Sequence, residues 1–280
     1  MSRSNLSGNT IAFVFALTLC TLGVLFFSPA SLAQAPLRIG MSPDAPPFES
    51  RDPSNPEKVV GFDIDMIDAV MAHLGRKYTI STFAFAGLVP AIQAGQLDLI
   101  VSDMWINEER AKVLDFVTYQ RASQAIIARA GNPLKITSMD SLCGVRAASK
   151  LGAVGVQKLQ DQDKACQAAG KKGVTVDSYP DAPALLRAID NDRTDAVMAD
   201  AVSAALNERD NPTKYVLAFV TQYDEVGGIR VAVGVKKGNM ELAELMRRGL
   251  AWYQESGAYD KAMAKWGIPM ALKESVKIVK

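Results

Sequence analysis

Arg110 lies in a stretch whose residue types and spacing could bind an anion. An apolar run, Leu97 to Val101, predicts a buried strand that ends in a polar turn. Asn107 then stands where a helix N-cap belongs, because its side-chain oxygen can accept from the free N–H groups of the first turn. The Arg110 charge opposes the helix dipole there. We therefore expect either an anionic ligand near Arg110 or a surface pair with a neighbouring carboxylate.

The N-terminus has the pattern of a secretory signal peptide. Arg3 is its only charge, an apolar run from Ile11 to Phe27 follows, and Ser31-Leu32-Ala33 supplies a small-x-small cleavage site. We expect residues 1–33 to be removed after Ala33. A retained membrane anchor is the alternative, because the apolar run approaches the length that spans a bilayer.

Composition excludes several classes of function for the mature chain. Without Arg3, the remaining 30 basic residues equal the 30 acidic ones. No basic face is implied, so we expect no nucleic-acid partner. No second apolar run has spanning length, so we expect a soluble product, and the length from Gln34 to Lys280 suits one large domain or two lobes.

Two cysteines, Cys143 and Cys166, remain after Ala33. In an oxidising compartment an even pair favours a disulfide, which would stabilise the fold by about 3 kcal/mol in the entropic model. Two reduced, buried thiols are the alternative. His73 is the only histidine and offers no metal-ligand spacing with two cysteines, so we expect no metal site and no cofactor.

Strand and helix patterns alternate through both halves of the mature chain, which is typical of parallel βα units. We expect an α/β fold with two lobes, each a mainly parallel sheet flanked by helices. Extended crossings near 119–126 and 219–226 would join the lobes, and the last strand and the two final helices would return to lobe one. Gly227-Gly228 precedes that last strand.

The expected elements follow from apolar periodicity and from Gly, Pro and capping residues. Asp44 to Glu49 is expected to be a loop, because prolines prevent a helix there. The expected strands are 37–41, 77–83, 97–101, 122–128, 144–147, 174–179, 195–199, 215–221 and 229–235. The expected helices are 62–74, 87–94, a short one after Asn107, 150–169, 182–190, 202–207, 240–255 and 259–265.

Five motifs in register resemble the bacterial extracellular solute-binding proteins of family 3, the periplasmic receptors of polar amino acid ABC transporters. The likeness runs from Leu37 to Pro269. The motifs are Arg38-Ile39-Gly40 before Pro47-Phe48-Glu49, Gly61-Phe62-Asp63-Ile64-Asp65-Met66, Phe85-x-Gly87-Leu88-x-Pro90-Ala91-Ile92, Asn107-x-x-Arg110-Ala111-x-x-x-Asp115-Phe116, and Tyr259-Asp260-Lys261 with Trp266-Gly267.

The resemblance implies a periplasmic-binding-protein-like fold of type II that closes on its ligand like a hinged clamp. Lobe one would comprise residues 34–122 and 223–280, and lobe two residues 123–222. The resemblance also implies a periplasmic monomer, not an enzyme, that captures a small zwitterionic ligand, a polar amino acid, and delivers it to ABC permease subunits in the inner membrane.

Site residues carry over from the resemblance one by one. Arg110 matches the arginine that forks onto the ligand carboxylate, and Asp200 matches the lobe-two carboxylate that receives the ammonium. A plain helix N-cap is the alternative for Asp200. Phe85 matches an aromatic wall of the pocket, or is a core residue. Ser149 and Lys150 fall where the family has a polar turn at a helix start that contacts the carboxylate.

Three departures from the family pattern bear on the ligand. Ala45 stands where many members have an aromatic lid, and Trp105 could supply the missing stacking surface or be a rim or core residue. Asp103 adds a carboxylate that would favour a cationic ligand side chain, or that only holds Lys150 across the cleft. Lys150 alone would favour an acidic ligand, so the ligand's identity stays open.

Two rival functions remain. An enzyme on the same scaffold, such as a cyclohexadienyl dehydratase, could use Asp103 or Glu225 as a general acid. No Ser-His-Asp set is available, because the only histidine, His73, falls on an expected helix far from the motifs. A sensor input domain is the second rival; no further spanning segment or signalling domain supports a fused version.

Overall fold

The computed structural model describes residues 34–221 and 229–280. The predicted signal peptide, Gly227-Gly228 and Glu225 lie outside the described residues. Within the described ranges, no helix has both the length and the apolar character needed to cross a bilayer.

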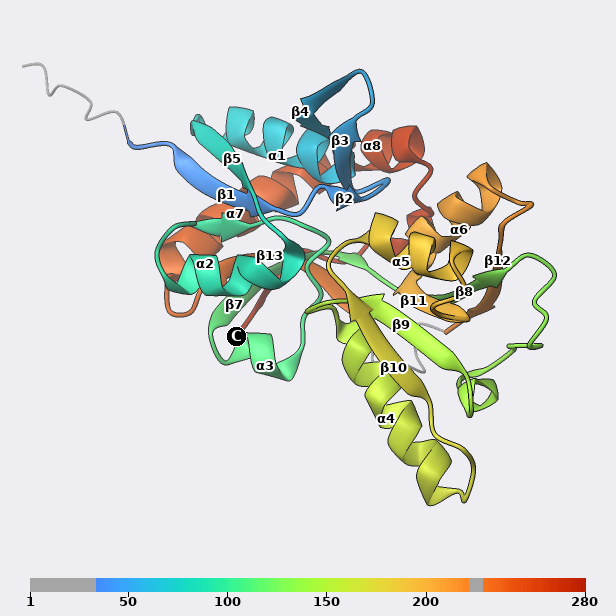
Figure 1. The fold of residues 1–280 in the computed structure, drawn as a ribbon. Coiled ribbons are helices and arrows are strands. Elements are labelled where there is room, and N and C mark those ends of the chain that lie inside the picture. Colours follow the sequence, from blue (N-terminus) through green and yellow to red (C-terminus); the bar gives the residue numbers. More distant parts are fainter. Residues whose placement is uncertain (1–33, 222–228) are drawn as a thin grey trace, which may run out of the picture. The chain divides into compact units, whose positions relative to one another are not determined.

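Lobe one is built on a six-stranded sheet (Figure 1). Its strands are β1 (Leu37–Met41), β5 (Tyr78–Thr82), β6 (Leu99–Ile100), β7 (Leu114–Arg121), β13 (Arg230–Lys236) and β14 (Ile278–Val279), in the order β14-β7-β13-β6-β1-β5. Its helices are α1 (Phe62–His73), α2 (Leu88–Gln93), α3 (Glu108–Ala111), α7 (Met240–Glu255) and α8 (Ala258–Trp266). The last long strand and both final helices thus belong to lobe one, as predicted.

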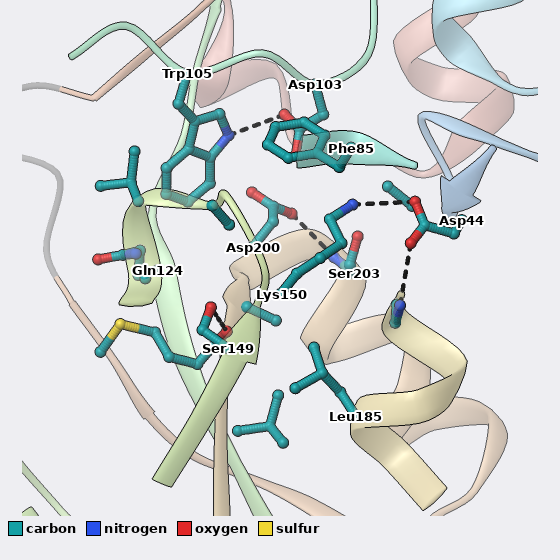
Figure 2. Close-up of a pocket in the computed structure, with 18 of the residues that line it drawn as sticks. Asp44, Phe85, Asp103, Trp105, Gln124, Ser149, Lys150, Leu185, Asp200 and Ser203 are labelled. Carbon is teal, nitrogen blue, oxygen red and sulfur yellow. Dashed lines mark hydrogen bonds and ion pairs between the residues drawn. The ribbon is translucent and has the colours of Figure 1, made fainter. Parts of the chain in front are cut away.

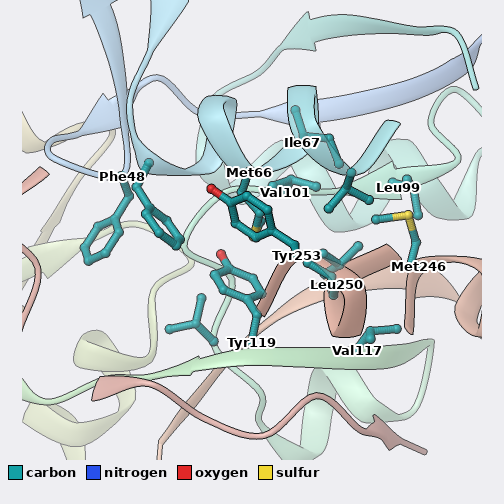
Figure 3. Packing of buried hydrophobic residues seen from close by; sticks show 14 of the residues in the cluster. Phe48, Met66, Ile67, Leu99, Val101, Val117, Tyr119, Met246, Leu250 and Tyr253 are labelled. Carbon is teal, nitrogen blue, oxygen red and sulfur yellow. The ribbon is translucent and has the colours of Figure 1, made fainter. Parts of the chain in front are cut away.

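Helices cover both faces of this sheet, because successive strand residues point to opposite sides. Along β13, Val231 and Val233 join one buried cluster and Ala232 joins another. α1, α7 and α8 contribute to the first cluster, and α2 contributes to the second. Figure 3 shows Met66 of α1, Leu250 of α7 and neighbouring side chains of the first cluster.

The close approach of α7 to α1 depends on Gly249. A Cβ at this position would come within 2.6 Å of Val70 and 2.8 Å of Leu74. A side chain here would therefore push the two helices apart and open the core of lobe one.

Lobe two is built on a five-stranded sheet in the same manner. Its strands are β8 (Gln124–Arg129), β9 (Arg146–Lys150), β10 (Thr175–Tyr179), β11 (Ala196–Asp200) and β12 (Tyr215–Val220), in the order β10-β9-β11-β8-β12. Its helices are α4 (Val154–Ala168), α5 (Ala182–Asp190) and α6 (Ala201–Asp210). Met198 packs in the cluster of α4, whereas its neighbour Val197 packs in the cluster of α5 and α6, so helices again cover both faces.

The expectation of mainly parallel sheets is wrong in part. β1 pairs in parallel with β5 and β6, and β9 pairs in parallel with β10 and β11. The pairs β13–β6, β13–β7, β14–β7, β11–β8 and β12–β8 are antiparallel. Both sheets are mixed because the strands next to the two crossings, β7 and β13 in one sheet and β8 and β12 in the other, run antiparallel to their neighbours. Parallel neighbours would need a crossover connection, usually a helix, between them.

Further elements differ from the sequence-based expectation. The segment around Asp44 is not only a loop, because β2 (Asp44–Ala45), β3 (Glu49–Asp52) and β4 (Asn55–Val60) form a small antiparallel sheet. β7 and β14 were not among the predicted strands, although the predicted crossing near 119–126 overlaps the end of β7. The helix expected from Lys150 begins at Val154, because Lys150 ends β9 and Gly152 turns the chain with φ +80°.

Cys143 and Cys166 are joined in a disulfide, as predicted. Cys166 is buried in α4, and Cys143 follows a short 3-10 helix, η2 (Met139–Leu142). The bond therefore ties α4 to the segment that leads into β9.

Candidate ligand-binding site

A pocket lies between the two lobes and is lined by strand ends and helix starts from both (Figure 2). Its volume is about 820 Å³, including space open to solvent. All seven residues that the sequence singled out as ligand-binding line it: Phe85, Asp103, Trp105, Arg110, Ser149, Lys150 and Asp200.

Arg110 enters the pocket from α3 (Glu108–Ala111) of lobe one. The side chain of Asn107 accepts from the Arg110 backbone N–H at 2.8 Å, which confirms the predicted N-cap. The Arg110 guanidinium donates to the carbonyl of Trp105 and, at 2.9 Å, to that of Gly152 in lobe two. These bonds use two of its five N–H donors. Burial lowers the pKa of Arg110 to about 10, and the Asp103 charge opposes that shift, so the group stays positive at neutral pH.

Asp200 enters from the end of β11 in lobe two and caps α6. One carboxylate oxygen, Oδ1, accepts from the backbone N–H groups of Val202 at 2.8 Å and Ser203 at 3.0 Å. The other, Oδ2, is buried and has no hydrogen-bond partner among the described residues. Burial raises the pKa of Asp200 to about 6, although the backbone hydrogen bonds favour the ion. Asp200 is therefore both a helix N-cap and a pocket residue with an unused acceptor.

Asp103 is held in place by two neighbours. It has a left-handed backbone, φ 39°, which is uncommon for a non-glycine residue. Its N–H donates to Asp63 Oδ2 at 3.1 Å, and Trp105 Nε1 donates to its Oδ1 at 3.0 Å. Trp105 also packs in the core cluster of lobe one, so it is a core residue as well as a pocket wall. Burial raises the pKa of Asp103 well above its usual range, and the charges of Asp200 and Asp63 add to this.

A second layer of buried polar groups supports Asp103, and none of its members was predicted as a site residue. Tyr119 donates its hydroxyl to Asp63 Oδ1 at 2.9 Å, and Ser102 donates to Glu49 Oε1 at 2.9 Å. Burial raises the pKa of Asp63 to about 6 and that of Glu49 well above its usual range. The presence of Glu49 and Asp63 in two of the family motifs was the signal that could have pointed to them.

Lys150 pairs with Asp44 and not with Asp103. The Lys150 ammonium donates to Asp44 Oδ1 at 3.0 Å and lies 4.5 Å from the ring centroid of Phe85. The idea that Asp103 only holds Lys150 across the cleft is therefore wrong, because the ammonium of Lys150 forms its ion pair with Asp44. Asp44 precedes the Pro47-Phe48-Glu49 motif, which was the only sequence signal for its place in the pocket.

Phe85 serves both of the roles that the sequence left open. It is 6% exposed and packs in the cluster of α2, yet it also lines the pocket from the short 3-10 helix η1 (Phe85–Gly87). The guanidinium carbon of Arg110 lies 5.2 Å from its ring centroid, so two protein cations lie close to this ring.

Ser149 and Lys150 do not lie at a helix start, as the resemblance implied, but at the end of β9. Ser149 donates its hydroxyl to the Met198 carbonyl at 2.8 Å, which leaves that proton unavailable to a ligand. Gly152 follows in a turn where a Cβ would lie 3.0 Å from Ala86 of lobe one. The turn thus brings lobe two against lobe one beside Arg110.

Several pocket residues carry no motif signal. Ser203 of α6 donates its hydroxyl to the Pro46 carbonyl of lobe one at 2.7 Å. The first N–H group of α5, that of Ala182, donates to Asp44 Oδ2 at 3.0 Å. Leu185, Leu186, Val197 and Ile127 supply apolar lining, and Gln124 also lines the pocket.

Comparison with known proteins decides the family. Residues 37–269 match the profile of the bacterial extracellular solute-binding proteins, family 3. The chain belongs to this family. It is 29% identical over 252 residues to "ABC transporter arginine-binding protein 1" of Escherichia coli (strain K12). The alignment covers 89% of this chain and 98% of the relative.

Solved structures of similar proteins agree with this assignment. An ancestral arginine-binding protein bound to arginine is 32% identical, with a TM-score of 0.74, covering 84% of this chain and 99% of the other. The ancestral amino acid-binding protein AncCDT-1, described as a precursor of cyclohexadienyl dehydratase, is 27% identical, with a TM-score of 0.71, covering 82% and 94%. The family 3 chain described here therefore has the two-lobed, type II binding-protein fold.

Proposed function

We propose that this chain is the periplasmic substrate-binding component of an ABC importer and that it captures a zwitterionic amino acid. Arg110 would bind the carboxylate and Asp200 the ammonium. Related solute-binding proteins named for arginine and for cystine support an amino acid as ligand.

One observation supports the proposal above all others. A guanidinium with unused N–H donors and a carboxylate with an unused, buried oxygen line the same pocket from different lobes. Burying an ion without a partner is expensive, and a buried charge is tolerated when an opposite charge and hydrogen bonds satisfy it. A zwitterion supplies both partners at once, because its carboxylate and ammonium have opposite charges.

The proposed mechanism is hinged closure. Lobe one, residues 34–122 and 223–280, would hold the carboxylate through Arg110, and closure would bring Asp200 of lobe two, residues 123–222, onto the ammonium. The chain passes from the sheet of lobe one to that of lobe two between β7 and β8, which supports a hinge there. The ligand would shift the open–closed equilibrium by its differential affinity for the closed form.

The proposal includes a cellular context. We infer that residues 1–33 are a signal peptide cleaved after Ala33, that the mature protein is a periplasmic monomer, and that its closed form docks on permease subunits. A protein that delivers its ligand unchanged has no catalytic role, so we expect no turnover of the bound amino acid.

Calorimetry across the twenty amino acids tests the proposal. The protein is unfolded and refolded first, so that any ligand carried through purification is removed, and the released small molecules are identified by mass spectrometry. We expect saturable binding of at least one amino acid and the same compound among the released molecules. Absence of binding by all twenty amino acids contradicts the proposal.

A second candidate function is an enzyme of the cyclohexadienyl dehydratase type. Its support is the similarity to AncCDT-1, an amino acid-binding protein described as a precursor of that enzyme, and the raised pKa of Asp103, because a carboxyl group with a raised pKa is a candidate general acid. Incubation with prephenate or arogenate tests this candidate. Product formation that is lost in Asp103→Asn would favour the enzyme over the receptor.

A further inference from the structure

The ammonium of Lys150 fills a place in the pocket that has the composition of a cation site. It lies 4.5 Å from the Phe85 ring centroid and 3.0 Å from Asp44 Oδ1. The side chains of Lys150 and Asp44 are only 14% and 13% exposed. Figure 2 shows Lys150 reaching from β9 across the pocket to Asp44. An aromatic face and a carboxylate together attract a cation, and here the protein's own side chain supplies that cation.

Most of the acceptor capacity of Asp44 is already used by the protein, three hydrogen bonds against about four lone-pair sites. Its Oδ1 accepts from Lys150 and, at 2.9 Å, from the Ser42 hydroxyl. Its Oδ2 accepts from the backbone N–H of Ala182 at 3.0 Å. A positively charged ligand group at Phe85 would therefore meet the charges of Lys150 and Arg110 without gaining a free carboxylate.

Asp103 is also a poor partner for a ligand cation. Its carboxylate already accepts from Trp105 Nε1. Its burial beside Asp63 and Asp200 raises its pKa, which favours the neutral acid. With Asp44 paired to Lys150 and Asp103 bonded to Trp105, Arg110 and Asp200 are the charged groups of the described pocket lining best placed to pair with a ligand, and the two ends of a zwitterion match them.

We propose that Lys150 is a specificity-determining residue that occupies the place of a cationic ligand side chain, so that the pocket accepts amino acids with uncharged side chains and rejects lysine, ornithine and arginine. This proposal rests on the proposed function, because it presumes that Arg110 and Asp200 hold the zwitterion. It also means that the names of arginine-binding relatives do not carry over to this chain.

Arginine and citrulline form the probe pair, because they differ in a guanidinium and a ureido group of almost the same shape. Affinities are measured by calorimetry, or by displacement of the amino acid that binds best. For the unmodified protein we expect citrulline to bind at least about tenfold more tightly than arginine, since charge alone separates the two. For Lys150→Met we expect the preference to reverse, because Phe85 and Asp44 then become available to the guanidinium.

Two matched variants separate charge from structure. Lys150→Arg keeps a cation over Phe85 and should keep the preference for citrulline. Lys112→Ala removes an exposed lysine that pairs with Glu109 outside the pocket and should change nothing. Lys150→Gln provides a second neutral variant if Lys150→Met does not fold, and the gain of arginine binding is a change that a damaged protein would not show.

The outcomes distinguish this proposal from the proposed function. Tighter binding of arginine than citrulline by the unmodified protein overturns the role of Lys150 alone, as does a neutral variant that gains no affinity for arginine. Tighter binding of glutamate than of glutamine overturns the proposal that the pocket selects ligands with uncharged side chains. Absence of binding by every amino acid overturns the proposed function and this proposal with it.

Discussion

Burial removes Arg110 and Asp200 from water, and the protein replaces only part of their lost hydration. Arg110 donates to two carbonyl groups, and Asp200 accepts two N–H groups on one oxygen only. Both residues line the pocket, and Oδ2 of Asp200 has no hydrogen-bond partner among the described residues. At the scale of residues, the site is thus incomplete in a way that a carboxylate and an ammonium would complete.

Asp200→Asn separates the two roles of this residue. Asparagine is as good an N-cap as aspartate, so α6 should keep its cap and the free energy of unfolding should change little. The charge that faces the ammonium is lost, and we expect ligand affinity to fall roughly 10- to 100-fold. Asp181→Asn is the matched control, because Asp181 caps α5 in the same way and does not line the pocket. Unchanged affinity in Asp200→Asn would leave Asp200 as a helix cap alone.

Ligand affinity should rise with pH between about 5 and 7. Burial raises the pKa of Asp200 to about 6, so this carboxyl group is largely protonated at pH 5 in the ligand-free protein. Binding of the ligand's ammonium group requires the ionised carboxylate. Below the pKa the affinity should fall by up to about tenfold per pH unit, and binding should release a proton. Calorimetry in buffers of different ionisation enthalpy measures both quantities. A flat profile, or affinity that rises on acidification, would contradict this assignment.

At the scale of elements, the sequence predicted the bounds of a helix best where a capping residue marks its start. The bounds of α5 and α7 agree with the prediction, and both helices have a side-chain N-cap, Asp181 and Asn239. α4 begins later than predicted, and its N-cap residue Ala153 makes no side-chain cap bond that could mark the start. β14 has only two residues and exists through its pairing with β7, which no local pattern reveals.

The same limit applies to the site. Motifs found the seven predicted lining residues, because their spacing along the chain is fixed. The partner of Lys150 could not be found in this way, since Asp44 lies 106 positions away and on the other lobe. Pair formation between lobes depends on how two sheets meet, which is a property of the fold and not of a local segment.

The disulfide belongs to the scale of elements, since it ties α4 to the segment before β9. Replacing both cysteines by serine should lower the free energy of unfolding by about 3 kcal/mol, mainly by releasing the unfolded chain. Ligand affinity should not change, because neither cysteine lines the pocket. Urea titration and calorimetry of the double variant check the two expectations. Equal stability of the two proteins would show that the crosslink contributes nothing.

At the scale of the whole molecule, the lobes contact each other around the pocket through side chains on both sides. Lys150 reaches Asp44, Ser203 donates to the Pro46 carbonyl, and Arg110 donates to the Gly152 carbonyl. Contacts of this kind exist only when the lobes are together, so they stabilise the closed form and slow the escape of a ligand.

Ser203→Ala tests this role of the contacts between lobes. Loss of one hydrogen bond of about 1 kcal/mol should weaken ligand affinity about fivefold, through faster dissociation and not slower association. Stopped-flow kinetics separate the two rates. Ser256→Ala serves as the control, because Ser256 donates within its own region of the chain, to Tyr253, away from the pocket. An effect confined to the association rate would refute the closure role.

The most direct measurement is a calorimetric cycle with two proteins, unmodified and Arg110→Met, and two ligands, an amino acid that binds and its amide, which lacks the carboxylate charge. The account predicts that the unmodified protein loses at least about 100-fold in affinity for the amide, because a charge-assisted, forked contact disappears. Arg110→Met should bind both ligands weakly and equally, with α3 and the rest of the fold intact. If Arg110→Met retains its affinity, or still discriminates against the amide, then Arg110 does not read the carboxylate and the account fails.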